Sequence, residues 1–325
     1  MIALDVAALV AGIAILYWGA EWLIRGSSAL ARGFGVKPLV VGLTVAAFGS
    51  SSPELVVATK TALTNHAPIA LGTVIGSCAA NLSLILGLTA LIRPPVVDGR
   101  VIKRELPVLV GSAIAVPLLF RNGVLSRLEG VLLVGCAVVF TIASLTVDAR
   151  LGADLDDRES RAEEAGASLG GKGRPRESRG VAIVMSALGL MLLVVGANAL
   201  VYGGRGIASE LHMSERMLGL TVIALGTALP ELVASVIGAL RGHESLTVGT
   251  LIGSNLMNVF LVLGVTASLQ PIHLGERMHL VDLVGLVAIT LLGVFMMRGS
   301  RKISRFEGVV LIAAYVAFMI CAATL

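Results

Sequence analysis

The stretch that decides the fold is GLTVAAFGSSSPELV at residues 42–56, because it recurs almost unchanged as GLTVIALGTALPELV at residues 219–233. Each copy places one glutamate, Glu54 or Glu231, inside an otherwise apolar run. The same offset of 177 residues, without a gap, links Gly19 with Gly196, Gly72 with Gly249, Gly76 with Gly253, Ser77 with Ser254, Asn81 with Asn258 and Gly87 with Gly264. The chain is therefore built from two homologous halves, and a carboxylate repeated in apolar surroundings marks a candidate functional site.

The composition is that of an integral membrane protein. Of the 325 residues, 56% are hydrophobic and only 14% are charged, whereas a soluble domain carries about 25% charged residues. The apolar runs are long and lack the alternation of membrane β-strands, so we predict an all-α membrane protein. The N-terminus becomes apolar almost at once, and we expect a first span there, not a removed signal peptide. The pI of about 9.2 comes from basic residues in short loops, which indicates membrane orientation and not nucleic-acid binding.

Apolar runs long enough to cross a bilayer, about 20 residues each, occur five times in each half. The predicted spans are residues 3–24, 38–62, 70–92, 105–120, 124–146, 181–203, 216–240, 247–269, 279–297 and 306–324. The predicted domains are a first five-helix repeat (1–147), a hydrophilic linker (148–180) and a second five-helix repeat (181–325). The linker is rich in Asp, Glu, Arg, Gly and Ser and has no apolar stripe, as expected of a solvated tether.

The basic residues predict how the chain is oriented. Of the 25 lysines and arginines, 19 fall on the side of the predicted membrane that holds the linker, and 6 on the other. The richer side is expected to be cytoplasmic, which puts both termini outside and makes the chain a multi-pass protein of the inner (plasma) membrane. Five spans is an odd number, so the halves must be inserted with opposite topology. We therefore predict ten transmembrane helices in two inverted five-helix repeats, with helices 2 and 7 broken.

The breaks are predicted at Pro53 and Pro230, because proline removes a helical N–H and clashes with the carbonyl four residues before it. Carbonyls freed at membrane depth must be satisfied by protein or by a polar cavity. Together with the hydroxyls and the glutamate that follow, they offer a set of oxygen ligands that suits a hard cation such as Ca²⁺ or Na⁺. The candidate ligands here are Ala47, Ser50, Ser51 and Glu54 in the first half and Ala224, Thr227 and Glu231 in the second. The alternative is a kinked packing helix whose glutamate is hydrogen-bonded internally.

A second motif follows in each half, with two glycines four residues apart that let helix backbones approach closely. They are Gly72 and Gly76 in the first half, and their repeat mates in the second. After them come Ser77 and Asn81, and correspondingly Ser254 and Asn258. Each serine lies four residues before its asparagine, so both side chains share one helix face. They could complete a cation shell, or they could join helices by hydrogen bonds.

The remaining polar residues predict little chemistry. Cys78, Cys136 and Cys321 lie in apolar runs at spacings that fit neither disulfides nor a thiolate metal site, so we expect small buried hydrophobic side chains. Glu21 and Arg25 are four apart and are expected to pair near a span end. Asp282 begins a predicted span, where a helix N-terminus favours an anion. The sequence contains no nucleophile elbow, P-loop or dinucleotide fingerprint, so we predict no enzyme and no cofactor.

With these motifs in hand, the chain resembles the cation/calcium exchanger superfamily and, within it, the sodium/calcium exchanger branch of prokaryotes. The resemblance covers both repeats, and it implies a core of spans 2, 3, 7 and 8 with ions bound at mid-membrane, across which the long helices 1 and 6 slide. By position, it places ion ligands on the eleven residues named above: Ala47, Ser50, Ser51, Glu54, Ser77, Asn81, Ala224, Thr227, Glu231, Ser254 and Asn258. Two residues depart from the pattern, since Ala228 replaces a common serine and Asn258 replaces a common aspartate.

These observations predict a secondary antiporter that exchanges Ca²⁺ for Na⁺ by alternating access. Its partners would be the two ions and the lipid bilayer, with no nucleic acid and no required protein partner. One alternative is a Ca²⁺/H⁺ antiporter in which protons replace Na⁺ on Glu54 and Glu231. A cation channel is a further alternative, although two inverted broken helices suit alternating access better than a continuous pore.

Overall fold

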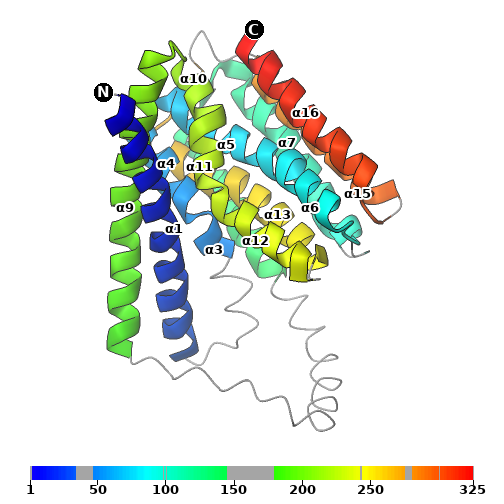
Figure 1. The fold of residues 1–325 in the computed structure, drawn as a ribbon, viewed down its shortest axis with the longest axis horizontal. Helices are drawn as coiled ribbons and strands as arrows, with labels where there is room; N and C mark the ends of the chain where they lie inside the picture. The colour runs from blue at the N-terminus through cyan, green and yellow to red at the C-terminus, as the bar shows by residue number, and fades with distance from the viewer. Residues whose placement is uncertain are drawn as a thin grey trace.

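The structure is a computed structural model that describes residues 2–33, 47–97, 99, 101–144, 179–241, 244–274, 280–299 and 301–324. Within these residues the chain is almost wholly helical (Figure 1). The elements of the first half are α1 (Ile2–Gly33), α3 (Ala47–Ser50), α4 (Ser52–Leu63), α5 (Ala67–Ala79), η2 (Ala80–Ile85), α6 (Leu86–Ile92), η3 (Val101–Glu105), α7 (Leu106–Leu119), η4 (Phe120–Asn122), β1 (Val124–Leu125) and the helix Arg127–Ser144. Those of the second half are α9 (Arg179–Glu210), α10 (Glu215–Leu218), η5 (Gly219–Ile223), α11 (Ala224–Thr227), α12 (Leu229–Arg241), α13 (Glu244–Met257), η6 (Asn258–Leu263), α14 (Gly264–Leu269), β2 (Ile272–His273), α15 (Leu280–Gly299) and α16 (Arg305–Thr324).

Seven helices in the described part of the chain are long and apolar enough to cross a membrane. An eighth arises if Glu215–Thr227 and Leu229–Leu240, which meet at a bend of 47°, are counted as one span. The prediction of a multi-pass, all-α membrane protein is therefore confirmed. The predicted span 38–62 is described only from residue 47 onward, and the linker 148–180 only at its last two residues, which already belong to α9.

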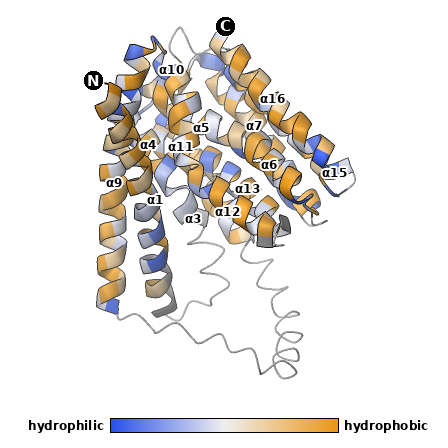
Figure 2. Cartoon of the chain, in the orientation of Figure 1, coloured by the Kyte–Doolittle hydropathy of each residue, from blue (hydrophilic) through white to orange (hydrophobic). Residues whose placement is uncertain are grey.

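Two of the spans form the centre of the molecule. In Ala67–Ile92 and Thr247–Leu269, 94% and 78% of the most apolar stretch is buried inside the protein, against 17% in Arg127–Ser144 and 22% in α1. Figure 2 shows apolar residues along the outer helices α9 and α16, which is where a membrane protein faces lipid. The buried core lies around α5, η2, α13 and η6, the elements that carry the second motif of each half.

The long helices α1 and α9 lie side by side in opposite directions over most of their lengths (Figure 1). They touch through glycines, because a Cβ at Gly19 would lie 3.0 Å from the carbonyl oxygen of Gly189, and a Cβ at Gly196 would lie 3.0 Å from that of Gly12. Gly12 and Gly19 are the repeat mates of Gly189 and Gly196, so the two contacts are copies of each other. Only glycine allows this backbone-to-backbone approach.

The same reciprocity joins other parts of the two halves. A Cβ at Gly87 would lie 2.8 Å from the carbonyl oxygen of Gly308, and a Cβ at Gly264 would lie 3.0 Å from that of Gly130. Two short antiparallel pairings repeat in the same way, namely Val124 with His273 and Val96 with Lys302. Each half thus packs against the other through the same contacts used twice.

One prediction from the apolar runs is wrong in part. Cys78 is buried as expected, but Cys136 and Cys321 are exposed. Both lie on outer helices, Arg127–Ser144 and α16, whose stretches are only 17% and 28% buried. In a membrane protein an apolar position is as often lipid-facing as it is internal, so hydropathy alone does not separate the two cases.

Candidate functional site

Both predicted helix breaks are present, at equivalent residues. In the first half α3 ends at Ser50 and α4 begins at Ser52, and in the second half α11 ends at Thr227 and α12 begins at Leu229. The residue between has nearly the same backbone conformation in both, with φ −87° and ψ 4° at Ser51 and φ −82° and ψ 2° at Ala228. The repeated sequence therefore folds into the same broken span twice.

The prolines start helices here, and do not kink them from within. Pro53 and Pro230 are each the second residue of the new helix, where a missing N–H has no intrahelical partner to lose. Glu54 and Glu231 follow in the first turn. A helix N-terminus carries a partial positive charge, so it stabilises a carboxylate at that position.

One predicted ligand behaves differently from expectation. The carbonyl of Ala224 was predicted to be freed by the break, but it accepts the N–H of Ala228 at 3.0 Å and the hydroxyl of Thr227 at 3.2 Å. Ser77, from the other half, lies 3.4 Å from the same oxygen. The bend occurs after this hydrogen bond, so Ala224 keeps its helical partner. The side chain of Ala47, its repeat mate, lies outside the described residues.

The two asparagines lie at a second irregularity. Asn81 lies in the π-helical turn η2 and Asn258 begins the equivalent turn η6, each within a central, mostly buried span. A π-helical turn inserts one residue into the helix and shifts its hydrogen bonds, and such turns are frequent at functional sites. The repeat thus places an amide at the start of the same distortion in both halves.

The side chains of the two halves meet. The Glu54 side chain lies beside Thr227 of the second half, and the Glu231 side chain lies beside Ser254. The two glutamates are close enough for the charge of Glu231 to act on Glu54. Nine of the eleven candidates are buried, namely Ser51, Glu54, Ser77, Asn81, Ala224, Thr227, Glu231, Ser254 and Asn258, and Ser50 is partly buried.

Five of these buried side chains present an oxygen with no hydrogen-bond partner among the described residues. The atoms are Ser51 Oγ, Glu54 Oε2, Asn81 Oδ1, Glu231 Oε2 and Asn258 Oδ1. A buried polar atom without a partner costs free energy, on the order of 1–3 kcal/mol and more for a charged group. Carboxylate, amide and hydroxyl oxygens are the ligands that hard cations prefer, so cations bound among them would offset this cost.

The candidate ligands are of mixed types. No group of three or more His, Cys, Asp or Glu that could hold a metal occurs within the described ranges. A site with two carboxylates and neutral oxygens suits ions that bind and leave, because a closed cage of charged ligands would hold them too firmly.

The structure also contains polar residues that the sequence analysis missed. Arg216 was placed at the start of the predicted span 216–240 and Asp282 was interpreted as a helix-end anion, but both are buried, with Arg216 Nε 3.2 Å from Asp282 Oδ2. Asn255, directly after Ser254, is 1% exposed and contacts Asn81. The sequence did contain a signal for these residues, because each is an ionisable or amide side chain within an apolar run. The predicted pair of Glu21 and Arg25 is present, at 2.6 Å and exposed.

Comparisons with known proteins show which family the chain is similar to. A family model described as sodium/calcium exchanger protein matches residues 4–146 and 181–323. The chain is 36% identical to the putative antiporter CaxA of Alkalimonas amylolytica, over 94% of this chain and 95% of that protein. It is 32% identical to the inner membrane protein YrbG of Escherichia coli (strain K12), over 97% and 96%. A solved structure of the sodium-calcium exchanger NCX_Mj, soaked with 2.5 mM Na⁺ and 0.1 mM Ca²⁺, superposes with a TM-score of 0.66 at 29% identity, covering 100% of this chain and 99% of that chain.

Proposed function

This chain belongs to the sodium/calcium exchanger protein family, and we propose that it is a secondary antiporter that exchanges Ca²⁺ for Na⁺ at the site between Glu54 and Glu231. The observation that carries the proposal is the set of five buried side-chain oxygens that lack a hydrogen-bond partner among the described residues. They come from both halves, and two of them belong to carboxylates.

Charge explains why such a site would exchange ions and not leak. Two ionised glutamates balance one Ca²⁺. Once the ion leaves, the uncompensated pair is costly to move through a low-dielectric barrier. The protein with an empty site therefore does not change conformation until Na⁺ binds to the same oxygens. This requirement couples the transport of the two ions. Competition for one set of ligands is enough to produce antiport.

We further propose the architecture in which this exchange would occur. The two halves would form ten membrane spans in inverted repeats of five, joined by a hydrophilic linker at residues 148–180. The paired helices α1 and α9 would move against the core formed by the two broken spans and the two central spans. The reciprocal contacts between the halves support this arrangement. Both termini would face outward and the linker would face the cytoplasm.

A second candidate is exchange of Ca²⁺ for H⁺ at the same glutamates. The site has asparagine at both 81 and 258, so its charge rests on two carboxylates whose free oxygens could each take a proton. The two candidates differ in the driving ion and share the site.

The test is uptake of radioactive Ca²⁺ into liposomes that contain the purified protein. A Na⁺ gradient alone is expected to drive uptake, and a pH gradient alone is not. Uptake driven only by the pH gradient would establish the proton-coupled alternative, and no uptake under either gradient would refute both. A flux that reaches channel rates, with single-channel currents, would show a pore instead.

A further inference from the structure

The strongest unassigned feature is a contact between two residues that are each other's repeat mates. Cys78 and Asn255 are 177 positions apart, and the side-chain amide of Asn255 donates a hydrogen bond to the backbone carbonyl of Cys78 at 3.2 Å. In return, the Cys78 thiol lies 3.9 Å from the backbone carbonyl of Asn255. A residue that touches its own mate lies where the two halves meet. The same point is also next to the candidate ion site.

Each of these two side chains holds an asparagine of the opposite half. Asn81 Nδ2 donates to Asn255 Oδ1 at 3.0 Å. At the equivalent place in the other half, the side chain of Asn258 lies beside the Cys78 thiol. All four residues are at most 2% exposed. The repeat therefore places a polar neighbour beside each asparagine, which is a hydrogen-bonded amide at Asn81 and a thiol at Asn258.

The contact decides which atom of Asn81 is left for an ion. An amide side chain has one end that donates and one end that accepts. Because the Nδ2 end of Asn81 is taken by Asn255, the Oδ1 end is left buried with no hydrogen-bond partner among the described residues. If the amide turned over, its NH₂ group would face the site and repel a cation.

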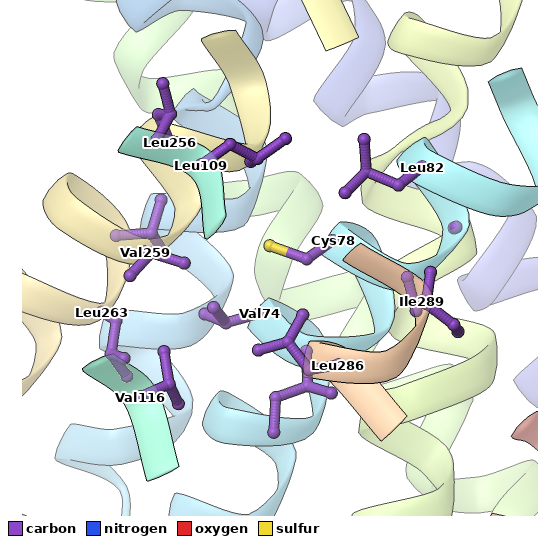
Figure 3. Close-up of a cluster of buried hydrophobic side chains, with 14 of the residues drawn as sticks. Val74, Cys78, Leu82, Leu109, Val116, Leu256, Val259, Leu263, Leu286 and Ile289 are labelled. Carbon is purple, nitrogen blue, oxygen red and sulfur yellow. The ribbon is translucent and has the colours of Figure 1, made fainter. Parts of the chain in front are cut away.

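The apolar surroundings restrict the orientation of the two asparagine side chains. Figure 3 shows Cys78 among apolar side chains such as Val74, Leu82 and Val259, which belong to one buried cluster. Such packing leaves few alternative partners for the amide groups, and a hydrogen bond in a low-dielectric interior is stronger than one in water. The two holding groups differ in strength, because an amide oxygen is a good acceptor and a thiol sulfur a weak one.

From these contacts we propose that Asn255 is a positioning residue for ion binding, which fixes the Asn81 amide with its oxygen toward the ion. Cys78 does the same for Asn258, but less firmly. The inference rests on the proposed function, since it assigns a role within the same ion site. It predicts that the two halves contribute unequally to ion affinity although their ligands are the same amide.

The test uses Asn255→Leu, which keeps the shape of the side chain and removes both hydrogen-bonding groups. The Ca²⁺ concentration for half-maximal uptake in liposomes, and that for half-maximal thermal stabilisation in detergent, should each rise about tenfold or more. Cys78→Ala should raise them by only about twofold to threefold, because the thiol is the weaker partner. Thr89→Val is the matched control, since Thr89 is equally buried and, among the described residues, its hydroxyl bonds only to the carbonyl of Ile85 in its own helix, at 2.8 Å.

A second measurement separates positioning from simple packing. On an Asn81→Ala background, Asn255→Leu should cause no further loss of Ca²⁺ affinity, because its effect passes through the missing amide. If Asn255→Leu does not fold, Asn255→Cys, which gives both halves the same thiol, replaces it in the same comparison. The inference is overturned if affinity stays within about twofold of wild type, or if the loss is the same with and without Asn81. Failure of wild type to exchange Ca²⁺ would instead refute the proposed function, and the thermal measurement would still report on Asn255.

Discussion

The buried pair of Arg216 and Asp282 provides the sharpest test of how the second broken span is anchored. Arg216 is the second residue of the short helix α10, and Asp282 lies in the first turn of α15. Their side chains are 6% and 0% exposed, with Nε and Oδ2 3.2 Å apart. Arg216 also donates to the carbonyl of Ala322 in α16. The pair therefore ties the start of the span that carries Glu231 to two outer helices.

The expected cost of breaking this pair is large. Asp282→Asn keeps the shape of the side chain and removes its charge, so the buried guanidinium loses the carboxylate beside it. Removing one partner of a buried ion pair costs about 3–5 kcal/mol. At about 2–4 °C per kcal/mol, the unfolding midpoint should fall on the order of 10 °C. The double variant Arg216→Met/Asp282→Leu removes both charges and should recover most of that loss.

The structure supplies both the assay and the control. Cys78 is buried, whereas Cys136 and Cys321 are exposed. In a Cys136→Ser/Cys321→Ser background, a thiol-reactive dye would therefore report unfolding through Cys78 alone. Glu21→Gln makes the same chemical change in the pair with Arg25, whose side chains are 38% and 57% exposed. Such an exposed pair contributes only about 0.5 kcal/mol, so the midpoint should barely move.

Two results would refute this reasoning. The first is an Asp282→Asn midpoint within about 2 °C of the parent, since a buried pair cannot be lost so cheaply. The second is a double variant that falls as far as the single one, because the loss would then come from packing and not from an unbalanced charge.

Three further outcomes are expected. Glu54→Gln and Glu231→Gln should each lower Ca²⁺ affinity by more than about a hundredfold while the protein stays folded, because about 3–5 kcal/mol of charge compensation is removed. Flux and thermal-stabilisation assays measure this, and uptake at the wild-type rate in either variant would reject the site. Gly19→Leu should destabilise by about 1–3 kcal/mol or more, because its Cβ would lie 2.8 Å from the backbone nitrogen of Leu193, whereas Gly135→Leu has open space and should not. A cysteine placed in the linker of a cysteine-free variant should react with an impermeant reagent only from the cytoplasmic face, and labelling from outside intact cells would contradict the orientation. Shortening the linker should leave exchange intact.

Much of the fold and the candidate site could be predicted because the same motifs occur in both halves of the sequence. The breaks beside Pro53 and Pro230 follow from proline chemistry, and their repetition singles out the two glutamates. Burial was harder to predict, since a bilayer is as apolar as a protein core. For this reason Cys136 and Cys321 could not be told apart from Cys78.

Contacts between distant elements could not be predicted at all. The pairing of Arg216 with Asp282, and that of Asn81 with Asn255, joins helices far apart in the chain. Neither follows from local pattern, because a helix does not reveal which neighbour its face meets. The retained hydrogen bond of Ala224 is a subtler case, since the break at Ala228 leaves the bond from Ala228 N–H to the Ala224 carbonyl in place.

The glycine contacts between α1 and α9 have a consequence for how the protein would respond to its bilayer. Each helix has 32 residues, which corresponds to about 48 Å, whereas the hydrocarbon layer is about 30 Å thick. The surplus must be taken up by inclination or by local thickening of the lipid. Because the two backbones touch over most of their lengths, neither helix can adjust alone. Hydrophobic mismatch would therefore tilt α1 and α9 together as one rigid unit, and the chain length of the lipids would set the angle between this helix pair and the rest of the molecule.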